Sequence, residues 1–409
     1  MAAMNVIRHH NDLIVIPRLQ TLRIFLLSCL WGTLTVAKQF LLSVIRSTKF
    51  DCNYIDNPPL CLVDNNLGHH SYVKIKGKGI KLHYIEAGPK DKSTVLLLHG
   101  FPDCWISWFN QIPELAKHFR VIALDLKGFG DSDKPSSRSA YKLEILLDEL
   151  TIFLSSLGIS RCAIIGHDIG ALLGFYLAHT NADLVSKFVA ISCIHPNIYW
   201  TERPKSSTFN QTWIQLSQLP FLPELDALKN DLALIDKCYK HLKDMKGGED
   251  YIQAYKYTFS RKEDWTGPLN YFRNLPFYRL DEQNLRELDV RCLLITGKSD
   301  ESILLESLVR STEYIRTYFL KVIDDAGHYP HQEKPEMVNT ALLEFLLDPP
   351  LIRSKKNPAT SSGLFGKVRE SVASSLKYGS TVLTGIQNDP NVAVASLVSK
   401  GLSYRSKSS

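Results

Sequence analysis

Short apolar segments recur along the chain, separated by segments in which apolar residues return every three or four positions. Apolar runs bounded by turn-forming residues predict strands that are buried on both faces, and the longer spacing predicts helices between them. Alternating strands and helices predict an α/β fold, with a mostly parallel sheet covered by helices on both faces. The predicted strands are Thr94–Leu98, Val121–Asp125, Ala163–Ile165, Phe188–Ser192, Cys292–Gly297 and Phe319–Ile323.

Two stretches depart from this alternation. Residues 71–87 alternate between apolar and polar positions around Gly77-Lys78-Gly79, which predicts a β-hairpin. From His195 to about Leu280 the pattern gives way to aromatic residues and prolines, which predicts a helical cap inserted between core strands. We therefore expect an N-terminal segment at residues 1–50 and a core in two parts, at residues 51–194 and 281–348. The cap occupies residues 195–280 between them, and a linker with a tail follows at residues 349–409.

The N-terminal segment contains an almost wholly apolar stretch from Leu22 to Ile45. A helix that crosses a membrane needs roughly 20 such residues. The charge-free part, Ile24–Ala37, is shorter, although a lysine such as Lys38 can extend its charge to the membrane surface. The stretch predicts a single-span or deeply inserted anchor, with an interfacial amphipathic helix as the alternative. Basic residues on its two sides nearly balance, so the sequence predicts no orientation.

The C-terminal tail follows Pro349-Pro350 and a polar linker. Apolar residues there recur at helical spacing among lysines, serines and glycines. A loose, partly helical tail is the favoured interpretation, and a helix that binds a membrane surface or a partner is the alternative. The apolar positions are Leu364, Val368, Val372, Leu376, Leu383 and Ile386.

Composition narrows the function only slightly. The 409 residues are 44% hydrophobic and 22% charged, with a formal net charge of +6, as in an ordinary globular protein with a sizeable core. The sequence has no basic stripe interleaved with aromatic residues, so we expect no nucleic-acid partner. The eight cysteines follow no metal-binding spacing, so we expect neither a metal nor a cofactor.

Candidate chemistry begins at Gly166-His167-Asp168-Ile169-Gly170, which joins a predicted strand to a predicted helix. Two glycines permit a sharp turn that presents the residue between them at the end of the sheet. A carboxylate such as Asp168 can attack a saturated, polarised carbon and form an alkyl ester, which water must then hydrolyse. The alternative is that Asp168 only caps the helix.

Hydrolysis of such an ester needs a base and an oxyanion hole. Asp300 and His328 each follow a core strand, and the chain order nucleophile, acid, histidine is typical of hydrolases built on a parallel α/β sheet. We expect His328 to activate the water and Asp300 to orient and stabilise His328. The backbone N–H groups of Phe101 and Ile169 are the candidate oxyanion hole. Taken alone, His328 could equally be a structural histidine.

Six motifs together resemble the epoxide-hydrolase branch of the α/β-hydrolases, in particular the membrane-anchored epoxide-hydrolase-like proteins of animals. The resemblance implies the α/β-hydrolase fold, a cis peptide bond between Phe101 and Pro102, a small apolar or lipid-like epoxide as substrate, and a single-pass anchor in the endoplasmic-reticulum membrane. The motifs, within residues 95–345, are His99-Gly100-Phe101-Pro102, Asp125-x-Lys127-Gly128-Phe129-Gly130-x-Ser132, Gly166-His167-Asp168, Gly267-Pro268-Leu269-Asn270, Gly297-x-x-Asp300, and Gly327-His328 followed by Glu333-Lys334-Pro335.

The sequence departs from the family where the resemblance implies two cap tyrosines that protonate the opened epoxide. Those positions hold Phe272 and Trp213, and Tyr271 lies one residue before the first of them. The family's tryptophan after the nucleophile is replaced by Ile169. Phenylalanine donates no hydrogen bond, and an indole N–H does not give up its proton. One residue turns a helical side chain by about 100°, so Tyr271 reaches the site only if the helix is rotated.

Three functions therefore stay open. The first is hydrolysis of lipid-like epoxides, with Tyr271 or another cap group as the proton donor. The second is a dehalogenase-type hydrolase, because halide leaves without a proton and Trp213 could donate a hydrogen bond to it. The third is a non-catalytic lipid-binding or scaffold protein on the same fold. Retention of Asp168, Asp300 and His328 argues against the third, because unused buried charges are costly.

Overall fold

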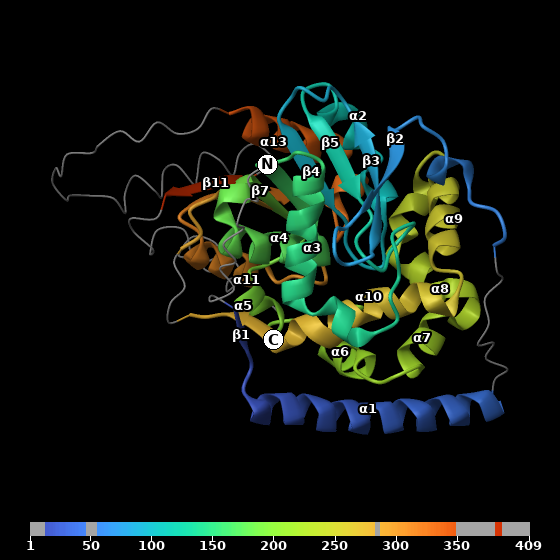
Figure 1. Cartoon of the computed structure of the whole chain (residues 1–409). Helices are drawn as coiled ribbons and strands as arrows, with labels where there is room; N and C mark the ends of the chain where they lie inside the picture. The colour runs from blue at the N-terminus through green and yellow to red at the C-terminus, as the bar shows by residue number, and fades with distance from the viewer. Residues whose placement is uncertain (1–12, 46–54, 283–286, 349–380, 387–409) are drawn as a thin grey trace.

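The computed structural model describes residues 13–45, 55–282, 287–348 and 381–386 (Figure 1). Its main feature is a nine-stranded sheet in the order β11-β10-β9-β7-β6-β4-β5-β3-β2. The strands are β2 His69–Lys74, β3 Lys81–Ala87, β4 Thr94–Leu98, β5 Arg120–Leu124, β6 Cys162–His167, β7 Val185–Ile191, β9 Arg291–Gly297, β10 Thr317–Ile323 and β11 Thr381–Ile386.

The six strands from β10 to β5 in this order run parallel, and the hairpin β2–β3 joins them antiparallel at one edge. The apolar runs of the sequence form these parallel strands because helices cover both faces: every residue of β4 and of β6 is buried. Helices α3, Leu143–Ser156, and α4, Asp168–Thr180, pack together on one face. Helices α2, Ile112–Leu115, and α13, Pro335–Leu347, contact each other on the opposite face. The predicted α/β architecture, with a mostly parallel sheet, and the predicted hairpin are confirmed.

Helices fill the interval between β7 and β9, and we call residues 196–274 the cap. Helices α6, α7, α8 and α10 lie together at one end of the sheet (Figure 1). A buried ion pair of 2.9 Å between Arg273 and Glu224 ties α10 to α7. The helices are α5 Pro196–Tyr199, α6 Gln211–Ser217, α7 Leu222–Ala227, α8 Lys229–Cys238, α9 Gly248–Thr258 and α10 Lys262–Asn274.

Helix α1, Arg18–Ile45, lies along the outside of the cap beside α6 (Figure 1). Over Arg18–Lys38 it is long and apolar enough to cross a membrane. The residues before it form β1, Leu13–Val15, which pairs antiparallel with β8, Tyr278–Leu280. Because β8 belongs to the folded domain, this pairing holds the residues that precede α1 against that domain.

The C-terminal tail is described only at β11, which pairs antiparallel with β10. Leu383 and Ile386, whose spacing indicated a helix, therefore lie in a strand. Two positions are too few to separate a helical period from a strand. The four other apolar positions of the predicted tail helix lie outside the described residues.

Candidate active site

Asp168 occupies the tight turn between β6 and α4. Its backbone is in the left-handed region, with φ of 45°, and its side chain is buried, with 5% of the residue exposed. The flanking glycines are required sterically: a Cβ on Gly170 would lie 2.3 Å from the carbonyl oxygen of Leu98, and one on Gly166 would lie 2.4 Å from the Cα of Ala171. The N-cap of α4 is His167, so Asp168 is not the capping residue. The turn therefore presents a carboxylate at the carboxyl edge of the sheet.

His328 and Asp300 form a close pair on the loops that follow β10 and β9. Nδ1 of His328 lies 3.1 and 3.0 Å from the two carboxylate oxygens of Asp300. Burial alone would lower the pKa of His328, but the charge and hydrogen bond of Asp300, together with the charge of Asp168, raise it above its usual value. Burial alone would raise the pKa of Asp300, and the same pairing lowers it instead. The pair is therefore charged more readily than either group alone would be.

The loop that carries His328 is joined directly to the turn that carries Asp168. Nε2 of His167 lies 2.9 Å from the carbonyl oxygen of His328, and the two imidazole centroids are 5.0 Å apart. A pocket of about 170 Å³ reaches His328 from between the core and the cap, with Phe209 and Tyr329 among its lining residues. The structure thus brings the three residues of the predicted triad to one edge of the sheet.

The two candidate oxyanion-hole residues adjoin the same turn. A Cβ on Gly100 would lie 3.1 Å from the Cβ of Asp168, which places the backbone leading into Phe101 against the nucleophile position. Ile169 is the second residue of α4, and N–H groups in the first turn of a helix have no carbonyl partner within it. The bond between Phe101 and Pro102 is cis, as the resemblance implied.

Aromatic rings from the cap cover this region of the sheet. Phe272 contacts Phe101 and Trp213, with ring centroids 4.8 and 5.0 Å apart respectively, and Phe209 lies 5.0 Å from Phe101. Phe272 therefore occupies a position at which the resemblance implies a tyrosine, and its ring brings no hydroxyl to the site. The wall that these rings form is apolar.

Tyr271 points elsewhere, and the structure does not support it as the cap donor. Its hydroxyl donates to the carbonyl oxygen of Lys127 at 2.9 Å, and its ring packs 5.5 Å from Phe129 and from Tyr141. Helix α10 is thus not rotated to compensate for Phe272. One step along the helix turns the Tyr271 side chain away from the rings above Phe101.

The structure shows a hydroxyl that contacts Asp168 and that the sequence analysis did not predict. Tyr199, at the end of the short helix α5, donates from Oη to Oδ1 of Asp168 at 2.6 Å. Burial, the largest effect, raises the pKa of the Tyr199 phenol well above its usual value. Helix α5 begins just after β7, the strand next to β6. Tyr199 could have been predicted from its place in the sequence shortly after β7, because neighbouring parallel strands such as β6 and β7 end at the same edge of the sheet.

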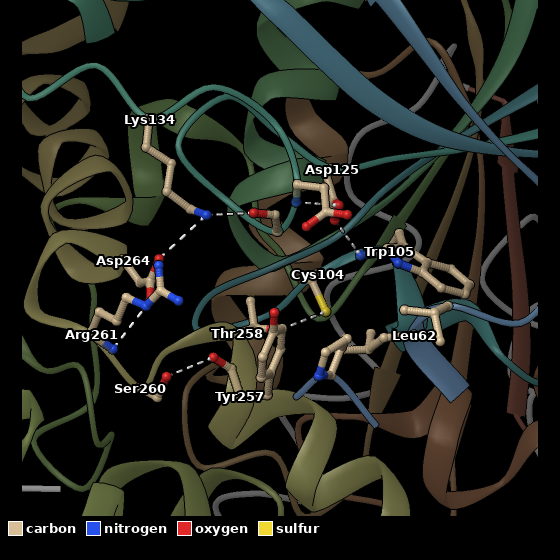
Figure 2. A pocket seen from close by; sticks show the side chains of 14 residues that line it. Leu62, Cys104, Trp105, Asp125, Lys134, Tyr257, Thr258, Ser260, Arg261 and Asp264 are labelled. Atoms are coloured by element: carbon tan, nitrogen blue, oxygen red, sulfur yellow. Dashed lines mark hydrogen bonds and ion pairs between the residues drawn. The ribbon is translucent and has the colours of Figure 1, made fainter. Parts of the chain in front are cut away.

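A second cavity, of about 200 Å³, lies between the loop after β5 and the end of α9 (Figure 2). Figure 2 shows Lys134 directed at Asp264, and the two charges are 3.3 Å apart. Asp125 accepts the backbone N–H of Trp105 at 2.8 Å and pairs with His83 at 2.7 Å. Lys134 and Asp264 join the loop after β5 to the cap, and Asp125 joins that loop to β3 and to the segment after β4. In the part of the chain that the structure describes, no cluster of His, Cys, Asp and Glu could hold a metal ion.

A parallel sheet, a carboxylate on a strained strand-to-helix turn, and an Asp–His pair on the following strand ends define the α/β-hydrolase class with an acidic residue at the nucleophile position. Residues 93–335 match the family described as "alpha/beta hydrolase fold". The chain is 34% identical to epoxide hydrolase 4 of Mus musculus over 303 residues, which are 71% of this chain and 83% of that protein. The chain therefore belongs to the α/β-hydrolase fold family, with epoxide hydrolases among its relatives.

Other comparisons agree. Epoxide hydrolase 3 of Xenopus tropicalis is 34% identical over 298 residues, 70% of this chain and 80% of that protein. A crystal structure of an epoxide hydrolase from Vigna radiata superposes with a TM-score of 0.58 at 25% identity, covering 69% of this chain and 99% of that one. An epoxide hydrolase from Bacillus megaterium, solved with an inhibitor, gives a TM-score of 0.58 at 26% identity, covering 68% of this chain and 100% of that one.

Proposed function

We propose that the protein is a hydrolase that opens epoxides to vicinal diols. The observation that carries the proposal is the carboxylate of Asp168 at the turn, beside His328 and its partner Asp300. The epoxide-hydrolase relatives support the same chemistry. The apolar wall of Phe101, Phe272 and the neighbouring rings favours a small apolar or lipid-like epoxide.

In the first half of the reaction an oxygen of Asp168 attacks a ring carbon of the epoxide. The carbon–oxygen bond of the ring breaks, and the product stays on the protein as an alkyl ester. The alkoxide that leaves must receive a proton, which is the task left open by Phe272 and Trp213.

In the second half His328 removes a proton from water, which attacks the ester carbonyl of Asp168. Asp300 holds the imidazole in the tautomer with Nε2 free to accept, and it stabilises the imidazolium. The N–H groups of Phe101 and Ile169 face the oxyanion that forms on the ester. Collapse of this intermediate releases the diol and restores the carboxylate, with no metal or cofactor needed.

The test is turnover of a broad panel of apolar epoxides by the purified full chain, with diol formation as the readout. Formation of diol from at least one class, lost in a variant without the Asp168 carboxylate, is the expected result. Release of halide from alkyl halides with no epoxide turnover would show the dehalogenase-type alternative instead. If neither product forms and no ester appears on Asp168, the chain is a non-catalytic member of the family.

Substitution Asp300→Asn is expected to move the acidic limb of the pH profile to lower pH. The rate of ester hydrolysis needs neutral His328, so it falls as pH drops below the pKa of that imidazole. Asp300 raises this pKa, and without its charge the opposing effect of burial prevails and lowers it. The plateau rate should also fall about 10²–10⁴-fold because the imidazole loses its orienting partner.

The measurement is the single-turnover rate of ester hydrolysis across pH. The matched control is Asp324→Asn, which removes an exposed carboxylate paired with Lys298 on the same edge of the sheet and should leave the profile unchanged. An acidic limb that stays in place in Asp300→Asn would contradict the assigned role.

We also propose that α1 attaches the protein to a membrane by lying in the plane of its surface. One side of the helix packs on the cap: Ser28 is buried, and a Cβ on Gly32 would lie 2.1 Å from a methyl carbon of Leu219. The opposite side is apolar and exposed, and on the cap beside it Phe221 is 66% exposed. The exposed apolar residues of α1 are Leu19, Leu22, Phe25, Leu26, Leu30, Leu34, Val36 and Leu41.

Contacts of the chain before and after α1 favour this interfacial arrangement over a span. Before the helix, β1 pairs with β8 of the folded domain. After it, Cys61 donates to the carbonyl oxygen of Asp250 in the cap. A helix that crossed the bilayer would carry β1 to the opposite side from β8. The endoplasmic-reticulum membrane stays a prediction of the sequence resemblance.

In sealed vesicles that carry the protein, an N-terminal tag is expected to be accessible to protease from the same side as the catalytic domain. Protection of the tag until detergent opens the vesicles would show a span and contradict the interfacial arrangement. Replacing Leu22, Leu26 and Leu30 together by glutamate should release the protein from vesicles, because the exposed side then carries charge. Replacing exposed Leu60, on the domain itself, by glutamate is the control.

A further inference from the structure

Tyr199 carries a hydroxyl that contacts the carboxylate proposed as the nucleophile. Its Oη is 2.6 Å from Oδ1 of Asp168. Both side chains are buried, so this hydrogen bond is formed in a region from which water is largely excluded. Oδ2 of Asp168 takes no part in this bond and is available to attack the epoxide carbon.

Short, well-packed elements hold Tyr199 in place. Pro196 begins α5, and the N–H of His195 donates to Oγ of Ser311 at 2.9 Å. The ring of His195 stacks on Tyr314 at 3.9 Å. The chain after β7 is therefore fixed at His195, and four residues beyond His195 the phenol of Tyr199 meets the turn after β6.

A cation lies against the Tyr199 ring. The guanidinium of Arg203 is 4.2 Å from the ring centroid, and Arg203 donates to the carbonyl oxygen of Phe209 at 2.7 Å. Burial raises the pKa of Tyr199 most strongly, and the charge of Arg203 opposes that rise. Arg203 is therefore placed to stabilise a phenolate that would otherwise be isolated in an apolar region.

Two other buried phenols near the cap donate to backbone carbonyl groups. Tyr271 donates to the carbonyl oxygen of Lys127, and Tyr239 donates to the carbonyl oxygen of Pro102 at 2.7 Å. Phe272 has no hydroxyl to offer. Within the residues that the structure describes, Tyr199 is the phenol whose hydrogen bond ends on Asp168.

We propose that Tyr199 is the catalytic acid that protonates the epoxide oxygen, in place of the two cap tyrosines that this chain lacks. The inference rests on the proposed function. As an epoxide enters, the O–H of Tyr199 turns from Oδ1 of Asp168 to the epoxide oxygen. Asp168 forms the new carbon–oxygen bond, the ring bond breaks toward the epoxide oxygen, and that oxygen takes the Tyr199 proton.

The proton balance then closes within the site. Ring opening leaves an alkyl ester on Asp168, a hydroxyl on the product and a phenolate at Tyr199 next to Arg203. Water attacks the ester carbonyl and gives one proton to His328. When the intermediate collapses, the hydrogen left on the former water oxygen passes to the departing alkoxide, which becomes the second hydroxyl of the diol. Transfer of one proton from the imidazolium to the phenolate, directly or through solvent, restores both groups. The sum is one epoxide and one water converted to one diol.

The test measures ester formation by intact mass in a His328→Gln background, where the second half of the reaction is blocked. Adding Tyr199→Phe is expected to slow ester formation from an apolar epoxide about 10²–10⁴-fold, the usual worth of a general acid. Tyr271→Phe is the matched control, because it removes a buried phenol one helix step from the site and should change the rate less than about threefold. Thermal melting of each variant checks that it is folded.

A purely structural role is separated by placing 3,5-difluorotyrosine at position 199, which keeps the size of the ring and lowers the pKa of its phenol. A catalytic acid works only while protonated, so the alkaline limb of ester formation should move to lower pH. An unmoved limb, or an unchanged rate in Tyr199→Phe, overturns the inference. If the unaltered protein forms no diol and the parent His328→Gln protein forms no ester with any epoxide, the proposed function fails instead.

Discussion

Substitution Asp168→Asn is expected to reduce epoxide turnover at least about 10⁴-fold, because an amide oxygen cannot displace the epoxide oxygen. Asparagine suits this position well: it tolerates the left-handed backbone at φ of 45° and can still accept the hydrogen bond from Tyr199. The loss should therefore come without unfolding. Diol formation by fresh protein, with the melting temperature beside it, is the measurement.

Deamidation is the main complication of this variant, since it would return aspartate to the turn. Intact mass detects it, and activity should rise only in proportion to the restored aspartate. Glu114→Gln is the control, because it neutralises an exposed carboxylate paired with Lys117 away from the site. Turnover within tenfold of the unaltered protein, with no deamidation, would show that Asp168 is not the nucleophile.

Substitution His328→Gln is expected to stop the reaction halfway. Asp168 and Tyr199 remain, so one equivalent of epoxide should be taken up and held as an ester. Turnover should fall about 10³–10⁴-fold because nothing removes the proton from the attacking water. The mass of the protein should increase by the mass of the epoxide, and peptide mapping should place the increase on Asp168.

The exposed histidine variant His118→Gln is the control and should turn over normally without a mass increase. A His328→Gln protein that loses turnover and accumulates no ester would mean that His328 acts before ring opening. In that case the pair of His328 and Asp300 supports the turn at Asp168 and does not activate water.

The sheet and the triad positions could be predicted from the sequence because each depends on local patterns. Buried parallel strands such as β4 and β6 are continuous apolar runs, and the turn at Asp168 carries its own glycines. Three polar residues at three strand ends then had to meet at one edge. The cis bond between Phe101 and Pro102 was expected from the family resemblance alone.

What escaped prediction depends on orientation and on distant contacts. Tyr199 lies in a helix of four residues, too short for a periodic signal. The choice between Tyr271 and Phe272 depends on the rotation of α10, which packing on Phe129 and Phe101 decides. The hydropathy of α1 predicts a span or deep insertion, with an interfacial helix as the alternative. The contacts before and after α1, above all the pairing of β1 with β8, favour the interfacial arrangement.

The pocket beside His328 gives water access to the imidazole. Lys237, Lys240 and Ser299 line it together with Phe209 and Tyr329, so polar groups that can hold water share one pocket with the imidazole. Hydrolytic water can thus reach the imidazole through this pocket, and the diol, being more hydrophilic than the epoxide, can leave along the same polar lining.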